Sequence, residues 1–308
     1  MNVKPLGTKE NFFYAFLIYS FISFAISVTS FVLFREIEKI DKTAQLVSSL
    51  KNKIQDYIRL DNDFLLYETI NSEYFRTEKS QYIDRQNVVA KEISVLTDSI
   101  LRSERAMAFH FDKDILSFEK LFQEKEILRK EIFKNIYQIG FKDYGLMGKM
   151  RKSAHAIENV PEINMASLLM LRRHEKDYFL RNDTTYISKH QKEKITFNKS
   201  ILNARSISSE DKNEILKELD NYSVFFDKIV QLERYTGYRN NTGLMYQMKV
   251  KTEKIDALIN HITFAAEERK ADILKKIQIV IVVMVTLSIL LLLMLVVSFN
   301  FVIRTAKI

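Results

Sequence analysis

Two uncharged, apolar runs lie near opposite ends of the chain. They read NFFYAFLIYSFISFAISVTSFVLF over residues 11–34 and IVIVVMVTLSILLLLMLVVSF over residues 279–299. A bilayer core about 30 Å thick is crossed by roughly 20 helical residues, so each run is long enough to span it. The first run is too long for a cleaved signal peptide, and a charged segment follows directly from Arg35. We therefore predict transmembrane helices over 11–34 and 277–303.

Two spans place both ends of the chain on the same side of the membrane. The short tails, residues 1–10 and 304–308, carry the basic residues Lys4, Lys9, Arg304 and Lys307. Positively charged residues next to a span favour the cytoplasmic side. We predict that both tails are cytoplasmic and that residues 35–276 are extracytoplasmic.

The segment between the spans has the sequence pattern of helices. Apolar residues recur there at spacings of three and four, and no sustained alternation of period two appears. The chain has only two prolines and six glycines, which leaves little material for turns. An all-α domain follows, and we place its six helices at 35–70, 78–108, 112–159, 162–182, 184–206 and 208–276.

Local signals mark several of the breaks between these helices. The stretch NSEYFRT, residues 71–77, predicts a break, and Pro161 suits the first turn of a helix. Ser208 followed by Asp211 resembles a capping box.

The predicted helices are very unequal in length, and short loops make neighbouring helices antiparallel. At about 1.5 Å per residue, the helices at 112–159 and 208–276 are the longest of the six. These two can run through the whole domain, while 35–70 and 78–108 reach only its membrane-proximal part. The hairpin 162–206 reaches only its distal part. The sequence therefore predicts two stacked four-helix bundles that share the two long helices.

Five of the six glycines lie in two short windows, residues 140–148 and 237–243. GLMGKMR at residues 145–151 returns as GLMYQMK at residues 243–249. On the predicted map Gly145 and Gly243 face each other where the two bundles meet. Glycine permits close helix approach or a local bend there. Two interpretations stay open for this inter-bundle seam of Gly145, Gly148 and Gly243: paired helix packing, or a ligand-lined or hinge-like seam.

A charged motif lies on the first helix of the predicted distal hairpin. LLMLRRHEKDYFLRND, residues 168–183, has apolar residues on nearly every side, which predicts a helix buried on most sides. Some of its charges must then be desolvated and paired, and the spacing suggests Arg172 with Glu175 and Arg173 with Asp177. Two interpretations stay open: an internal ion-pair network, or a cationic pocket for a carboxylate.

Other chemical signals are weaker. Arg59, Asp63 and Tyr67 lie along one side of the predicted helix 35–70, where a site in the membrane-proximal (lower) bundle could form. His155 suits a satisfied interior histidine better than a metal ligand, because no partner lies at ligand spacing. The chain has no cysteine, and no nucleophile elbow, phosphate-binding loop, dinucleotide fingerprint or metalloprotease motif appears. We expect no enzymatic activity, cofactor or metal.

The net charge of +8 arises from 47 basic residues distributed among 39 acidic ones. Such mixing is typical of a solvated helix surface, and it leaves an attraction for small anions as the second interpretation. No basic stripe flanked by aromatic residues appears, so nucleic acid is not an expected partner.

The motif at 168–183, together with GLMGKMRKSAHAIE at 145–158, resembles the helical bimodular sensor domain of bacterial transmembrane receptors. The resemblance covers the whole segment between the spans. It implies two stacked four-helix bundles, a homodimer in the bacterial inner membrane, small organic acids bound inside the bundles, and a cytoplasmic signalling module. The positions that match the motif are Arg172, Arg173, Glu175, Lys176, Asp177, Leu180 and Arg181. Such receptors normally continue into a HAMP coiled coil, of which RTAKI at 304–308 would be the first turn.

Two classes of function follow from these patterns. In the first, the domain binds a small organic acid and relays a helix displacement across the inner membrane. The candidate ligand-binding residues are Arg172, Arg173, Glu175, Lys176, Asp177, Arg181, Arg59 and His155. In the second, a membrane-anchored helical module docks a periplasmic partner protein or holds a dimer. A polar-lined cavity near Arg172 or the glycines favours the first, and exposed apolar patches on 162–206 favour the second.

Overall fold

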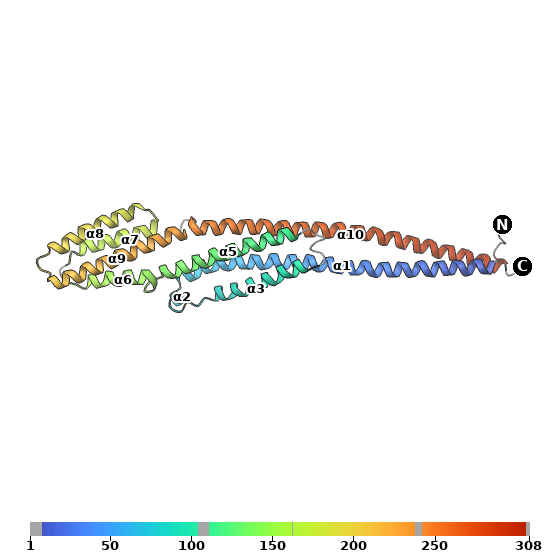
Figure 1. The fold of residues 1–308 in the computed structure, drawn as a ribbon, viewed down its shortest axis with the longest axis horizontal. Coiled ribbons are helices and arrows are strands. Elements are labelled where there is room, and N and C mark those ends of the chain that lie inside the picture. Colours follow the sequence, from blue (N-terminus) through green and yellow to red (C-terminus); the bar gives the residue numbers. More distant parts are fainter. Residues whose placement is uncertain (1–7, 104–110, 162, 238–241, 306–308) are drawn as a thin grey trace. The chain divides into compact units, whose positions relative to one another are not determined.

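The computed structural model describes residues 8–103, 111–161, 163–237 and 242–305. No strand occurs within these ranges, so the prediction of an all-α chain is confirmed. The helices, shown in Figure 1, are α1 (Thr8–Tyr67), the 3₁₀ turn η1 (Glu68–Ile70), α2 (Ser72–Thr77), α3 (Gln81–Arg102), α5 (Asp112–Ile139), α6 (Gly145–Glu158), α7 (Met165–Arg181), α8 (Thr185–Asn203), α9 (Ser209–Thr236) and α10 (Gly243–Thr305).

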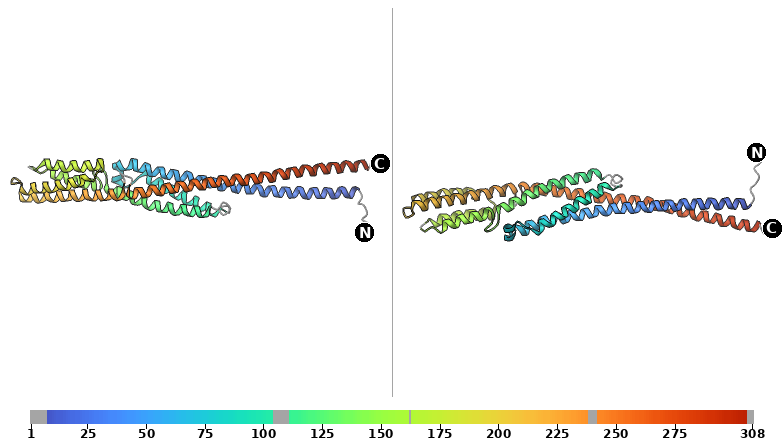
Figure 2. Two further views of the ribbon diagram at one scale, coloured as in Figure 1. Left: turned by 90° about the horizontal axis from the view of Figure 1, so that it is seen from above. Right: turned by 60° about the horizontal axis from the view of Figure 1, so that its bottom comes forward.

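The helices form two compact units. The first comprises residues 1–51, 96–115 and 260–308, and the second comprises 52–95 and 116–259. In the first unit, the N-terminal part of α1 and the C-terminal part of α10 lie side by side in all views (Figures 1 and 2).

Both α1 and α10 contain a segment that is long and apolar enough to cross a bilayer, judged by length and composition. The mean hydropathy of the most apolar window is 2.1 in α1 and 3.3 in α10, and no residue of either window is buried. Neither helix is interrupted within the predicted spans 11–34 and 277–303. Residues 1–7 and 306–308 of the predicted tails lie outside the described residues.

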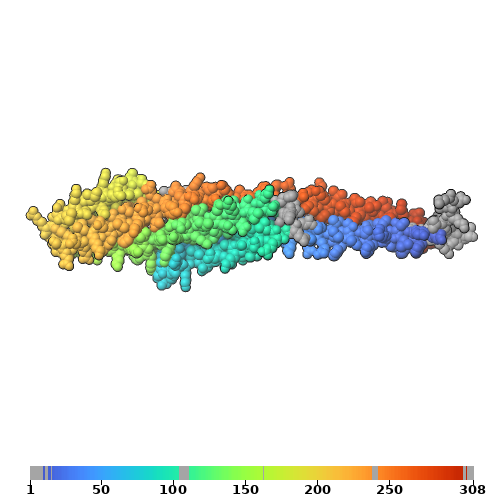
Figure 3. Space-filling view, in the orientation of Figure 1, coloured from blue at the N-terminus to red at the C-terminus, as the bar shows by residue number. Residues whose placement is uncertain are grey.

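In the second unit, α6, α7, α8 and α9 enclose one apolar core. α6 packs along α9, as Figure 3 shows, while α7 packs along α8 and α8 along α9. The core side chains recur at spacings of three and four on each helix, as a helical stripe requires. On α9 these residues include Ile215, Leu219, Tyr222, Phe226 and Ile229. They bury almost completely against Leu168, Leu171, Tyr178 and Phe197 of the neighbouring helices.

A second core of the same unit is aromatic. Phe64 of α1 stacks on Phe133 of α5 with ring centroids 3.7 Å apart, and Tyr74 meets Phe64 edge-on at 5.3 Å. Tyr74 belongs to α2, which occupies the stretch 71–77 where the sequence predicted a break. The Asn71 side chain caps this short helix by accepting a hydrogen bond from the backbone N–H of Glu73 at 3.0 Å. Burial of its two aromatic residues explains why the stretch folds.

Two further helix starts were predicted from local signals. Ser208 is the N-cap of α9, and its Oγ accepts from the backbone N–H of Asp211 at 3.1 Å, which confirms the predicted capping contact. The expectation for Pro161 is wrong, because α7 begins only at Met165. There the side chain of Asn164 accepts from the backbone N–H of Ser167 and caps the helix.

The predicted continuous helices 112–159 and 208–276 are both wrong. The first is interrupted between α5 and α6, and the second between α9 and α10. Each interruption starts and ends on a glycine with left-handed backbone: Gly140 and Gly145 have φ of 83° and 64°, and Gly237 and Gly243 have φ of 68° and 51°. The repeated GLM sequences are therefore two helix restarts.

Each glycine also allows its own chain to fold back closely. A Cβ on Gly140 or Gly237 would overlap the backbone carbonyl of Tyr144 or Thr242, and one on Gly145 would lie 2.6 Å from the Cα of Gly140. The nearest atoms around each of these glycines belong to the same break or to the last turn of the helix before it. The contacts therefore favour the local bend over close approach of two long helices.

Gly140→Ala should destabilise the protein, whereas Lys142→Gly in the same break should not. Alanine is strained at positive φ and overlaps Tyr144, which costs about 1 kcal/mol or more. Lys142 has φ of 52°, so glycine there relieves strain and gains roughly 0.5 kcal/mol after the entropy of the unfolded chain is counted. Thermal unfolding followed by circular dichroism measures both. An unchanged midpoint for Gly140→Ala would contradict the assigned strain.

Candidate functional site

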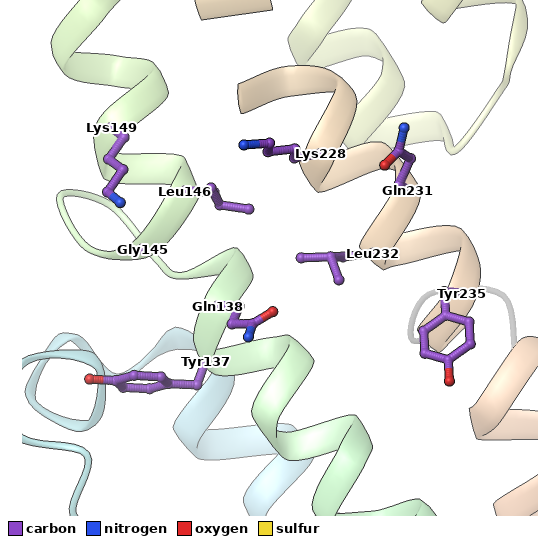
Figure 4. Close-up of a pocket in the computed structure, with 9 residues that line it drawn as sticks. All are labelled: Tyr137, Gln138, Gly145, Leu146, Lys149, Lys228, Gln231, Leu232 and Tyr235. Carbon is purple, nitrogen blue, oxygen red and sulfur yellow. The ribbon is translucent and has the colours of Figure 1, made fainter. Parts of the chain in front are cut away.

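A pocket of about 610 Å³ lies beside the break between α5 and α6. Three helices border it, and Figure 4 shows the side chains. α5 contributes its last turn, α6 its first turn, and α9 its C-terminal half. The lining residues are Tyr137, Gln138, Gly145, Leu146, Lys149, Lys228, Gln231, Leu232 and Tyr235.

Helical spacing gathers these residues on one side of each helix. On α9 the lining positions follow the pattern i, i+3, i+4 and i+7 from Lys228, so they share one face. On α6 Leu146 and Lys149 are three residues apart and share a face in the same way. Because α6 restarts at Gly145, the glycine break decides which side chains of α6 reach the pocket.

The pocket combines apolar walls with polar groups. In Figure 4 the Lys228 side chain extends from α9 toward α6, and Leu146 and Leu232 extend toward each other across the space. Gln138 also points into this space, whereas the ring of Tyr137 points away from it. A pocket of this size with a few convergent polar groups is typical of small-molecule sites.

Among the described residues, no acidic group compensates the positive charge of the pocket. Neither Lys149 nor Lys228 forms an ion pair or hydrogen bond with any described residue, and the described lining residues include no carboxylate. The side-chain amides of Gln138 and Gln231 likewise form no hydrogen bond with the described residues. Two ammonium groups and two amides that can donate hydrogen bonds suit an anion, and the leucine and tyrosine walls suit its organic part.

The arginines of the predicted charged motif have acidic partners instead. Arg172 of α7 pairs with Glu158 of α6, and Arg173 lies 3.9 Å from Asp177, the pair that the spacing predicted. Arg181 also contacts Asp177, at 3.6 Å. These contacts agree with the interpretation as an ion-pair network. The predicted pairing of Arg172 with Glu175 is wrong, since no such ion pair forms within the described ranges.

Glu175 forms a hydrogen bond with a tyrosine of α9 instead. Its carboxylate accepts a hydrogen bond from the hydroxyl of Tyr222 on α9. Burial raises the pKa of Glu175, and the bond from Tyr222 and the charges of Arg172 and Lys176 oppose that rise. Lys176 itself is exposed.

The predicted burial of the 168–183 helix on most sides is wrong. Only one face of α7, with Leu168, Leu171 and Tyr178, enters the core. Leu180 is 83% exposed and Leu169 55% exposed. Apolar residues on all sides of α7 thus reflect one buried face and one exposed apolar face.

The core between α7, α8 and α9 contains a histidine that the sequence analysis did not single out. His190 is fully buried, its ring centroid lies 4.2 Å from that of Phe226, and neither ring nitrogen has a described partner. Burial lowers the pKa of His190 to about 3, so the ring is neutral at physiological pH. This neutral side chain adds no charge to the core.

The two remaining candidate residues lie on the surface. His155 is half-exposed, its Nδ1 is 2.7 Å from Glu158, and Arg151 Nε donates to its Nε2 at 3.2 Å. The prediction of an interior histidine is therefore wrong. Arg59 is 61% exposed and pairs with Asp56 of its own helix at 2.8 Å, and its role in a binding site stays a prediction.

A buried polar network joins α1, α3 and α5. Gln86 Nε2 of α3 donates to Asp61 Oδ1 of α1 at 2.6 Å, and Lys125 Nζ of α5 donates to the other oxygen of Asp61. Arg129 Nη1 donates to Gln86 Oε1 at 3.1 Å and also pairs with Glu126. Burial lowers the pKa of Lys125, and Asp61 opposes that fall. The network is charge-balanced and therefore suits helix registration better than ligand capture.

The sequence contained a signal for this network. Lys125 and Arg129 continue the apolar stripe of Phe118 and Phe122 at spacings of three and four, and Asp61 lies between Tyr57 and Phe64 in the same way. A charge within an otherwise apolar stripe indicates a buried, paired group.

Comparison with protein-family models, with curated proteins and with solved structures finds no match. The resemblance to helical bimodular sensor domains therefore stays a prediction.

Lys125→Ala should lower the free energy of unfolding by about 3–5 kcal/mol, because it leaves the buried Asp61 carboxylate unpaired. The double variant Asp61→Leu with Lys125→Met should recover much of that loss, since apolar residues can replace a buried ion pair. Chemical denaturation of these variants and of Asp61→Leu alone gives the coupling free energy between Asp61 and Lys125. Additive effects would contradict a buried pair.

Proposed function

We propose that the chain is the sensing and transmembrane part of a bacterial receptor that binds a small organic acid. One observation carries the proposal: Lys149 and Lys228 border one pocket, and neither has an anionic partner among the described residues. A carboxylate ligand would supply the missing charge. The proposed role is binding and signalling, with no catalysis by this chain.

The two apolar helices support the membrane part of the proposal. α1 and α10 would cross the bacterial inner membrane at 11–34 and 277–303, with residues 35–276 on its outer side. In the proposed architecture two four-helix bundles stack, and the distal one is built from α6, α7, α8 and α9. A homodimer and a cytoplasmic signalling module would complete the receptor.

The helix breaks suggest how binding is relayed. A carboxylate held by Lys149 of α6 and Lys228 of α9 would favour one spacing of these helices, and the left-handed glycines would let α6 move against α5. α10 restarts at Gly243 and continues without interruption into its apolar segment. A ligand shifts such an equilibrium only by its difference in affinity for the two states, and a tenfold difference is worth about 1.4 kcal/mol.

A second candidate function is a membrane-anchored module that docks a periplasmic partner or holds a dimer. It is favoured by exposed apolar side chains on the distal hairpin, namely Met165, Leu169 and Leu180 on α7 and Ile195 and Leu202 on α8. This surface does not account for two unpaired lysines in one pocket, so ligand binding remains the better proposal.

A thermal-shift screen of the full chain in nanodiscs tests the proposal. We expect one or more of acetate, succinate, malate, citrate and benzoate to raise the unfolding midpoint above a sodium chloride control of equal ionic strength. The double variant Lys149→Gln with Lys228→Gln should lose that rise, because each charge-assisted contact contributes roughly 1.5–3 kcal/mol.

The matched control is Arg173→Gln with Lys176→Gln, which removes the same charge from α7. It should keep the full rise. Loss of the rise in this control with retention in the lysine variant would place the ligand at the charged motif instead. No response to any acid would favour the docking module.

A further inference from the structure

The pocket that contains Lys149 and Lys228 differs in chemistry between its two ends. The start of α6 and the end of α9 both border it, and the two helices pack along each other, so they run antiparallel there. Leu146 and Leu232 extend toward each other and mark one level of the pocket (Figure 4). Lys149 follows Leu146 by about one turn, and Lys228 precedes Leu232 by about one turn. In antiparallel helices both lysines therefore lie at the same end, beyond the leucines.

The opposite end of the pocket has no cation among the described lining residues. It is bordered by Tyr235, which lies on α9 about 10 Å from Lys228 along the helix axis. The Tyr235 side chain is 54% exposed, so its ring is available for contact. Because α9 ends at Thr236, the partial negative charge of a helix C-terminus lies next to this ring. A carboxylate at this end would be repelled.

The start of α6 does not reverse this polarity. α6 begins at Gly145, and a helix N-terminus has a partial positive charge. A Cβ on Gly145 would lie 2.8 Å from the backbone carbonyl oxygen of Gln138, in the last turn of α5. The C-terminal end of α5, with the opposite partial charge, thus lies directly against the start of α6 and offsets it. Lys149 and Lys228 remain the full charges of the pocket among its described lining residues.

We propose that this pocket binds a monocarboxylate with an apolar chain or ring. The carboxylate lies between Lys149 and Lys228, and the apolar part extends between Leu146 and Leu232 toward Tyr235. The pocket volume of about 610 Å³ leaves space for that part beside the carboxylate. This inference rests on the proposed binding of an organic acid and narrows the class of that acid.

A series of straight-chain acids tests the proposal. Acetate, butyrate and hexanoate are titrated calorimetrically into the full chain in nanodiscs, with empty nanodiscs as the baseline. Each buried methylene contributes a factor of about three or four in affinity, so hexanoate should bind about tenfold more tightly than butyrate. Succinate has the carbon chain of butyrate with a second carboxylate at its end. It should bind at least about tenfold more weakly than butyrate, because that charge would enter the apolar part without a partner.

The variant Leu232→Gln distinguishes the apolar contacts from the charged ones. Leu232 is half-buried, and its replacement should remove most of the advantage of hexanoate over acetate while the affinity for acetate is kept. The matched control Leu202→Gln, at a 55% exposed position on α8, should keep both affinities. Lys149→Gln with Lys228→Gln should instead weaken all the acids by a similar factor. Equal thermal unfolding of these variants without acid shows that loss of fold is not the cause.

The possible failures are distinguishable. Succinate binding as tightly as butyrate would overturn this inference and leave the proposed binding of organic acids intact. An affinity that does not rise with chain length, or a rise that Leu232→Gln leaves unchanged, would overturn it in the same way. If none of the acids binds, the proposed function itself is wrong, and this inference with it.

Discussion

The left-handed glycines that stop and restart the helices are the constraint on which the second unit depends. An α-helix ends where a residue favours another backbone conformation. For an L-residue other than glycine, the left-handed conformation costs roughly 1–2 kcal/mol of free energy. Glycine removes that cost at Gly140 and Gly237, where the backbone N–H of each closes the preceding helix on the carbonyl four residues earlier. The restart at Gly145 then sets the helical phase of α6, and with it the placing of Lys149 beside α9.

Ion pairing distinguishes the polar side chains that stabilise the fold from those that can bind a ligand. Asp61, Gln86, Lys125 and Arg129 satisfy one another in the interior, where a charge without a partner is costly. The arginines of α7 likewise have carboxylate partners. Lys149 and Lys228 are different, because they are accessible to solvent and have no acidic partner within the described ranges. The richest charged motif of the sequence is thus largely neutralised, and the candidate site uses two ordinary lysines.

Much of the fold follows from the sequence because it depends on short-range chemistry. The spacing of three and four specifies helices, and the Ser208 cap positions α9. The sequence did not predict the breaks inside the two longest helices. A glycine that bends a helix and a glycine that ends one cannot be told apart from the sequence alone. The positive φ of the glycine at each end of a break is visible only in the folded backbone.

The candidate site was less accessible to prediction. Gly145 was placed at a ligand-lined or packing seam, and it does border the pocket, but Lys149 and Lys228 were not singled out. They are 79 positions apart in numbering and sit among many exposed lysines, so only folding brings them to one pocket. Spacing within α7 showed the pair Arg173–Asp177 but could not show that Arg172 reaches Glu158 on another helix.

The most direct measurement is an experimental structure of the protein with the organic acid that stabilises it most. We expect density for the acid beside Gly145, with a carboxylate oxygen within hydrogen-bond distance of the Nζ atoms of Lys149 and Lys228. Density for the acid beside Arg172 and Arg173, or an empty pocket at a saturating concentration of the acid, would contradict it.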